Sequence, residues 1–163
     1  MTDKGKTLET AATGADTTLR PGEIAIELPP DFDAGLYFIG RIRTPWRLRQ
    51  DCPRQGDRTK GPECFAEIDA RYLAALKGIE GKAELQILYW MDFARRDLVI
   101  QVPRTHGEVS GTFALRSPVR PNPIASSIVT LLRVEKNGLA VRGLDCLDGT
   151  PLLDVKPFVC HES

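Results

Sequence analysis

The sequence has no long apolar run, and its opening residues lack the apolar segment of a secretory signal peptide. A membrane-spanning helix needs about 20 mostly apolar residues, so neither a membrane span nor an export signal is predicted. We therefore expect a cytoplasmic protein with no membrane partner, whose cysteines remain free thiols in a reducing compartment. Residues 1–20 are polar and rich in Thr, Ala and Gly, and we predict a disordered leader there.

Metal ligands and partners for a catalytic nucleophile are also scarce. Only two histidines and four cysteines are present, and no two cysteines form a CxxC pair. Zinc sites usually draw their four ligands from short motifs of this kind, so no metal site is predicted. No histidine-based catalytic triad is evident. The sequence also lacks a GxGxxG turn and a P-loop, so any nucleotide-like ligand must be held by other means.

The chain has no net charge, because 22 basic residues balance 22 acidic ones. This balance neither supports nor excludes nucleic-acid binding. The basic residues are distributed unevenly, however, since residues 41–60 contain seven of them and only two acidic residues. Such a run is typical of a solvated loop. It is also where a nucleic-acid backbone would find cationic partners.

Length and hydrophobic pattern predict one β-rich domain over residues 21–163. A helix is expected at 70–81, where apolar residues recur at helical spacing, and Asn137-Gly138 predicts a hairpin. Short apolar or alternating segments bounded by Gly and Pro predict the strands at 23–28, 36–44, 63–68, 84–91, 98–103, 111–115, 126–134, 138–144 and 149–159. The expected fold class is all-β and mainly antiparallel, a small closed or partly closed barrel of about seven strands with one helix.

One loop-like stretch, RSPVRPNPI at 116–124, contains three prolines and two arginines. Proline holds φ near −65°, so the three prolines fix the path of the loop before any ligand arrives. Arg116 and Arg120 offer planar donors that suit a carboxylate or a phosphate. In the alternative interpretation, these arginines join loops together by pairing with acidic residues, namely Asp145, Asp148 or Asp154.

Two further stretches, CPRQG at 52–56 and GLDCLDGTPLLDVKPF at 143–158, contain forked or acidic side chains. Arg54 and Gln55 both have forked hydrogen-bonding groups. Carboxylates beside the Asp-Gly-Thr-Pro turn would suit a ribose diol or a cationic amine. Taken alone, the first stretch is more typical of an ordinary exposed loop, and the second is more typical of a plain turn.

Four unusual strings occur in a fixed order along the chain: IGRIRTPW, PRQG, GTFALRSPVRPNPI and GLDCLDGTPLLDVKPF. Together they resemble the TsaA-like family, also called the YaeB or TrmO family, over residues 36–160. The resemblance implies a small β-barrel that binds S-adenosyl-L-methionine without a Rossmann fold, typically as a homodimer. Characterised family members methylate N6 of threonylcarbamoyl-adenosine 37 beside the tRNA anticodon. S-adenosyl-L-methionine is therefore the expected cofactor, and tRNA and a second copy of the chain are the expected partners.

The resemblance implies a cofactor site assembled from distant segments. The matching residues are Pro53, Arg54, Gln55, Arg116, Ser126, Cys146, Leu147, Asp148 and Gly149. We add Asp92, Phe93 and Asp145 as candidate cofactor contacts. An amide-like acceptor nitrogen must lose a proton, and Asp92 and Asp145 are the candidates to accept it. Contacts with tRNA are expected from five basic residues, namely Arg41, Arg43, Arg47, Arg120 and Lys156.

The sequence departs from the family pattern at positions that bear on the methyl acceptor. Glu84 and Gln86 stand in place of the usual His-x-Trp, and the pair 92–93 replaces a second histidine. We also expect no counterpart of the C-terminal extension of the larger tRNA-modifying members. Three hypotheses remain open: a tRNA methyltransferase, a non-catalytic module that binds S-adenosyl-L-methionine, and a methyltransferase for another small substrate.

Overall fold

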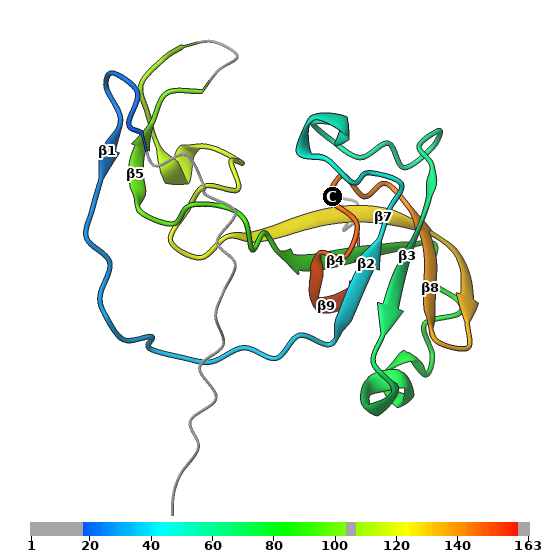
Figure 1. Ribbon diagram of the computed structural model, residues 1–163. Coiled ribbons are helices and arrows are strands. Elements are labelled where there is room, and N and C mark those ends of the chain that lie inside the picture. The colour runs from blue at the N-terminus through cyan, green and yellow to red at the C-terminus, as the bar shows by residue number, and fades with distance from the viewer. Residues whose placement is uncertain (1–17, 104–106, 160–163) are drawn as a thin grey trace, which may run out of the picture. The chain divides into compact units, whose positions relative to one another are not determined.

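The structure is a computed structural model of the chain, and it describes residues 18–103 and 107–159 (Figure 1). Most of the leader predicted at 1–20, both histidines and Cys160 lie outside the described residues. The chain divides into two compact units. Of the described residues, 18–27, 93–103 and 107–121 form the smaller unit, and 28–92 and 122–159 form the larger. The single domain over 21–163 stays a prediction.

The larger unit is a closed barrel of antiparallel strands, which confirms the predicted fold class. Six strands form it, against the expected seven or so, in the order β2-β3-β8-β7-β4-β9. Their bounds are β2 Gly40–Arg43, β3 Glu63–Ile68, β4 Glu84–Trp90, β7 Ile124–Glu135, β8 Gly138–Arg142 and β9 Pro151–Pro157. A barrel leaves no free sheet edge, so each of these strands is paired on both sides.

Alternation along the strands places the core inside the barrel. In β4, Leu85, Ile87 and Tyr89 are buried, while the residues between them are half-buried. Buried apolar side chains from the other strands, such as Val129 and Leu139, belong to the same cluster. Successive side chains of a strand point to opposite faces of the sheet, so this pattern fixes which residues of β4 face the interior.

The β7–β8 hairpin forms where Asn137-Gly138 predicted it. Gly138 has a positive φ of 156°, and a Cβ there would lie 2.1 Å from the Ala66 carbonyl oxygen, so a side chain is excluded. The predicted helix at 70–81 is instead a shorter 3-10 helix, η2 Ala70–Leu76. It ends early because Gly78 has a φ of 86°, which is incompatible with a continuing right-handed helix.

The smaller unit is a three-stranded antiparallel sheet in the order β1-β5-β6. Its elements are β1 Ile24–Ala25, β5 Leu98–Gln101, β6 Ser110–Gly111 and the 3-10 turn η3 Thr112–Ala114. The strand predicted at 111–115 was therefore wrong beyond its first residue. The chain turns there because Gln101 binds the Thr112 side chain and Arg120 binds the carbonyl of Leu115. No helix among the described residues is long and apolar enough to cross a membrane.

Candidate functional site

Two loops of the barrel unit lie against each other at the candidate site. We call residues 52–56 the PRQG loop and residues 143–150 the LDG loop. A Cβ on Gly56 would lie 1.8 Å from the carbonyl oxygen of Gly143, so the two backbones touch where only glycine fits. Burial, and after it the negative charge of Asp145, raises the pKa of the Cys52 thiol. The PRQG loop therefore lies against the LDG loop at Gly56 and Gly143, and the cofactor contacts predicted at 53–55 and 145–149 stay predictions.

The LDG loop is fixed by hydrogen bonds to the residues that follow β2. The Thr44 amide donates to Asp148 Oδ1 over 3.1 Å, and the Asp148 amide donates to the Trp46 carbonyl over 2.8 Å. The Thr44 hydroxyl donates to the carbonyl of Cys146 over 2.9 Å. Gly149 adopts a φ of 82°, which a glycine tolerates without strain. The side chain of Asp148 thus anchors the loop, and Cys146 is buried beneath it.

Asp145 is the half-buried carboxylate of the LDG loop. Tyr89 lies near the C-terminal end of β4, and its hydroxyl donates to Asp145 Oδ1 over 2.6 Å. The same hydroxyl lies 2.9 Å from Ser127 Oγ. Burial and the adjacent Asp145 charge raise the pKa of Tyr89, so its phenol keeps its proton and remains a donor. Within the described part of the chain, no other hydrogen bond reaches the Asp145 side chain, which leaves Oδ2 available to a ligand.

Tyr89 and Ser127 were not among the residues that the sequence singled out. The alternation of β4 carried a usable signal, since it places Tyr89 on the inner face as the one hydroxyl in an apolar row. The predicted contact Ser126 pairs with Leu88 and therefore points to the opposite face from Tyr89. Its hydroxyl accepts a hydrogen bond from Gln86 Nε2 at 2.9 Å. The structure thus does not bring the Ser126 side chain to Asp145, and a contact through its backbone stays a prediction.

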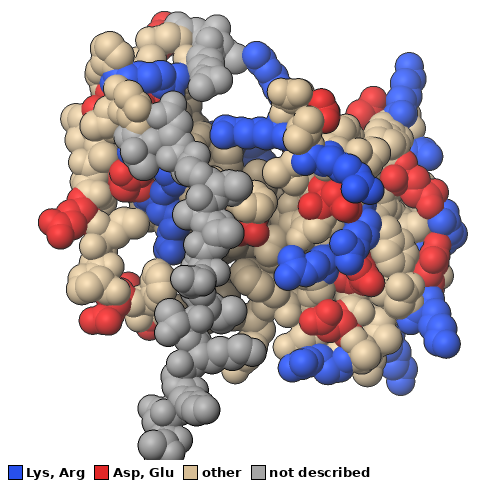
Figure 2. Space-filling model, in the orientation of Figure 1, with Lys and Arg blue, Asp and Glu red and all other residues tan. Residues whose placement is uncertain are grey.

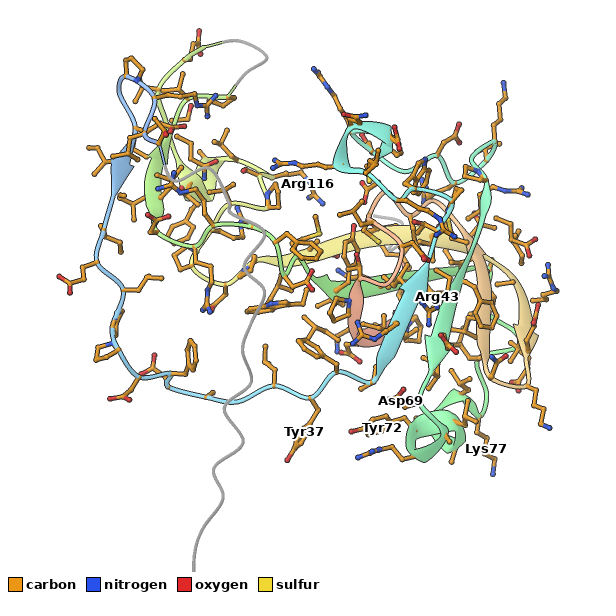
Figure 3. All side chains as sticks on the ribbon, viewed as in Figure 1. Tyr37, Arg43, Asp69, Tyr72, Lys77 and Arg116 are labelled. Carbon is orange, nitrogen blue, oxygen red and sulfur yellow. The ribbon has the colours of Figure 1, made fainter. Side chains whose placement is uncertain are left out.

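Arg116, labelled in Figure 3, is exposed in the proline-rich loop of the smaller unit. That loop is held by Arg120, whose Nη2 donates to the carbonyls of Leu115 and Thr112 over 2.6 and 3.2 Å. Gln101 Nε2 donates to the Val119 carbonyl over 2.7 Å. Arg120 therefore joins parts of its own loop, through carbonyl groups and not through the aspartates considered above. The cofactor contact predicted for Arg116 stays a prediction.

The remaining predicted residues are mostly at the surface. Pro53, Arg54 and Gln55 are exposed in the PRQG loop. Asp92 is exposed just after β4, and Phe93, with 68% of its surface exposed, begins the smaller unit. Their roles as a cofactor contact or a proton acceptor stay predictions. Among residues 18–103 and 107–159, no group of three or more His, Cys, Asp and Glu side chains is placed to hold a metal ion.

Basic side chains of the barrel unit alternate with acidic ones on the face shown in Figure 2. Arg47 is exposed, and Arg43 projects from β2 (Figure 3). Three residues predicted to contact tRNA form bonds within the barrel unit: Arg41 to the Gly149 carbonyl, Arg43 to Glu67 and Lys156 to Asp154. Exposed ion pairs such as those of Arg43 and Lys156 contribute only about 0–1 kcal/mol. A phosphate can therefore replace the acidic partner at small cost, and the tRNA contacts stay predictions.

Comparison with known proteins places the chain in a family. A family model described as the tRNA-methyltransferase O N-terminal domain matches residues 41–162. The probable S-adenosyl-L-methionine-binding protein VirR of Rhizobium radiobacter is 55% identical to the chain, over 86% of this chain and 80% of its own length. An S-adenosyl-L-methionine-binding protein of Archaeoglobus fulgidus is 42% identical, over 74% of this chain and 86% of its own length.

A solved structure resembles the barrel as well. The crystal structure of TrmO from Pseudomonas aeruginosa superposes with a TM-score of 0.64 at 30% identity, over 78% of this chain and 57% of that chain. The chain thus spans little more than half of the solved TrmO protein. The family match includes the barrel strands together with the PRQG and LDG loops. By this match, and by its identity to VirR, the chain belongs to the family of the tRNA-methyltransferase O N-terminal domain.

Proposed function

We propose that this chain binds S-adenosyl-L-methionine where the PRQG and LDG loops meet, and that it is a methyltransferase acting on tRNA in the cytoplasm. The observation that carries the proposal is the packing of Gly56 against Gly143, which places the exposed residues 53–55 beside the half-buried Asp145. The names of the relatives, which describe proteins that bind S-adenosyl-L-methionine, support the choice of ligand.

The side chains of the two loops suit the chemical groups of that ligand. S-adenosyl-L-methionine has donors in its ammonium group, ribose hydroxyls and adenine amine, and an acceptor in its carboxylate. Asp145 Oδ2 would accept from one of the donors. The guanidinium of Arg54 suits the carboxylate, and Gln55 has both a donor and an acceptor for an adenine edge.

The chemistry requires the protein mainly to align two reactants. The bound cofactor would supply an electrophilic methyl group on its sulfonium. Correct alignment of donor and acceptor contributes about 7–11 kcal/mol to lowering the barrier. The acceptor nitrogen must lose a proton, and Asp92 and Asp145 are the two carboxylates that we propose to take it. We propose N6 of threonylcarbamoyl-adenosine 37 as the acceptor, from the resemblance to family members that modify it.

Binding of tRNA would rely on the basic run between residues 41 and 60. Arg47 and Arg54 are exposed there. Arg41 and Arg43 lie on β2, beside the loops of the candidate site. Because each neutralised phosphate releases counterions, affinity for an anticodon stem-loop should fall steeply as salt is raised. We also propose a homodimer, which would double the basic surface available to one tRNA. Sedimentation of the native chain tests that part.

Calorimetry of the folded chain with S-adenosyl-L-methionine tests the proposed ligand. The native chain should bind, and Asp145→Ala should abolish or strongly weaken binding. Asp154→Ala is the matched control, since this aspartate pairs with Lys156 on β9 and should bind as the native chain does. Incorporation of labelled methyl groups into bulk tRNA, followed by nucleoside analysis, then tests the acceptor. No binding heat from a folded native chain would contradict the proposal.

A non-catalytic binding module is the second candidate. It is favoured because two relatives that cover most of this chain are named as S-adenosyl-L-methionine-binding proteins. Calorimetry with S-adenosyl-L-methionine and methyl incorporation into bulk tRNA distinguish the two candidates. Binding without methyl transfer to any RNA would support the module, and transfer that is lost in Asp145→Ala would support the enzyme.

A further inference from the structure

Two hydroxyl groups lie next to the LDG loop: that of Tyr89, near the C-terminal end of β4, and that of Ser127 on β7. Tyr89 has only 2% of its surface exposed and is packed with the core residues Leu85 and Ile87. Ser127 stands opposite Ile87 in the β4–β7 pairing, so it faces the same side of the sheet as Tyr89. A buried phenol needs a hydrogen-bonding partner. Here the phenol has two, Ser127 Oγ at 2.9 Å and Asp145 Oδ1 at 2.6 Å.

The hydrogen bonds of this group have a defined direction. An ionised carboxylate can only accept, so the single phenolic proton of Tyr89 is donated to Asp145. The phenolic oxygen is then an acceptor, and Ser127 must donate its own proton to it. The result is a directed chain from Ser127 through Tyr89 to Asp145. A hydrogen bond to a charged acceptor is about twice as strong as a neutral one, so the last link holds the carboxylate firmly.

The carboxylate at the end of this chain has no cationic partner. No Lys or Arg in the described ranges forms an ion pair with Asp145, although the residue is half-buried. Taking a charge partly out of water is unfavourable unless other groups compensate for the lost hydration. A neutral amide oxygen would also accept from the Tyr89 hydroxyl, without the cost of a half-buried charge. The presence of an acid therefore indicates that its remaining oxygen, Oδ2, serves a ligand.

We propose that Tyr89 and Ser127 are positioning residues that fix the Asp145 carboxylate, so that Oδ2 accepts a hydroxyl or amine donor of S-adenosyl-L-methionine. This inference rests on the function proposed above. Oδ1 is held from the barrel core, where strand pairing fixes Tyr89 and Ser127. The carboxylate is thereby oriented before the ligand arrives, and a preorganised group loses little entropy when it binds. Without the phenol, the carboxylate would be free to rotate and hydrate.

Tyr89→Phe removes the donor and keeps the ring that fills the core. We expect it to weaken binding of S-adenosyl-L-methionine about tenfold, because a hydrogen bond to a charged group is lost. Tyr72→Phe is the matched control, since Tyr72 is a half-buried tyrosine packed at the edge of the same core and should bind as the native chain does. Ser127→Ala removes only a hydroxyl and should weaken binding in the same direction, which keeps the test valid if Tyr89→Phe does not fold.

A double-mutant cycle separates positioning from mere structural support. If Tyr89 acts through the carboxylate, Tyr89→Phe should have little further effect on the dissociation constant in an Asp145→Asn background. Equal effects of Tyr89→Phe in both backgrounds would overturn the inference. Native-like binding by folded Tyr89→Phe or by Ser127→Ala would also overturn it, while leaving the proposed function intact. Absence of binding by the native chain would overturn both.

Discussion

Gly56 is the position at which one added carbon atom should disturb the candidate site most. A Cβ there would lie 1.8 Å from the carbonyl oxygen of Gly143 and 2.3 Å from its carbonyl carbon. Ordinary non-bonded contacts are roughly 3.5 Å, so Gly56→Ala requires the two loops to separate by about 1.5 Å. Gly143 cannot easily move away, because its own φ is 115° and a Cβ built on it would lie 2.8 Å from Arg58 Cγ.

The separation predicts two measurable effects. Overpacking of this kind costs about 1–3 kcal/mol in the free energy of unfolding. For a chain of this length, each kcal/mol lowers the melting temperature by about 2–4 °C, so a fall of roughly 2–12 °C is expected. Moving the PRQG loop away from Asp145 also removes ligand contacts worth about 1.5–3 kcal/mol. Affinity for S-adenosyl-L-methionine should therefore fall about 10- to 100-fold.

Thermal melting and calorimetry of Gly56→Ala check both effects. Gly81→Ala is the matched control, because nothing lies within 4 Å of its Cβ position and its φ is outside the left-handed region. Replacing glycine at such a position reduces the entropy of the unfolded chain, so the control should melt at the native temperature or slightly above it. A Gly56→Ala chain that melts and binds as the native chain does would refute the close packing of the two loops.

Two further predictions concern neighbouring parts of the molecule. In a Cys160→Ser background, Asp145→Asn should speed the labelling of Cys52 by a thiol reagent at about pH 8. Burial first, and then the Asp145 charge, raise the pKa of Cys52, so removing that charge lowers the pKa and yields more thiolate. If labelling is no faster, Asp145 does not act on Cys52, and the proximity of the two residues is contradicted. Arg120→Ala should lower the melting temperature, because the carbonyls of Leu115 and Thr112 lose a charged donor worth about 1–3 kcal/mol. The exposed Arg47→Ala should leave the melting temperature unchanged, and equal values for both variants would contradict a structural role for Arg120.

The barrel strands could be predicted from the sequence because each leaves a local signal. β3 coincides with the alternating segment predicted at 63–68, and the β7–β8 hairpin lies at Asn137-Gly138. Alternation with a period of two indicates which face of a strand is buried, and Asn-Gly indicates a turn. Both signals lie within the segment itself, so neither requires knowledge of distant residues. The prediction failed at 111–115, where the turn depends on bonds from Gln101 and Arg120 that no local pattern reveals.

The candidate site was only partly predictable for a related reason. The resemblance identified the PRQG and LDG loops, and the structure brings them together through Gly56 and Gly143. It also indicated Ser126, whose cofactor contact stays a prediction, but it did not indicate Ser127, whose hydroxyl lies 2.9 Å from the Tyr89 hydroxyl. A shift of one residue moves a side chain to the other face of a sheet. The pairing of β7 with β4 therefore decides which of the two serine side chains faces Tyr89, and the sequence alone does not specify that register.

The site and the barrel are stabilised by the same contacts. The LDG loop connects β8 with β9, and the Gly149 amide donates to the carbonyl of Ile42 on β2. Since β2 and β9 are paired, the loop is positioned when the barrel closes. Tyr89 adds a second connection, from the core to the carboxylate of Asp145. A ligand that binds only this closed arrangement must stabilise the barrel, by about 2.7 kcal/mol at a concentration one hundred times its Kd. The loop geometry that selects the ligand is thus inseparable from the strand pairing that forms the fold.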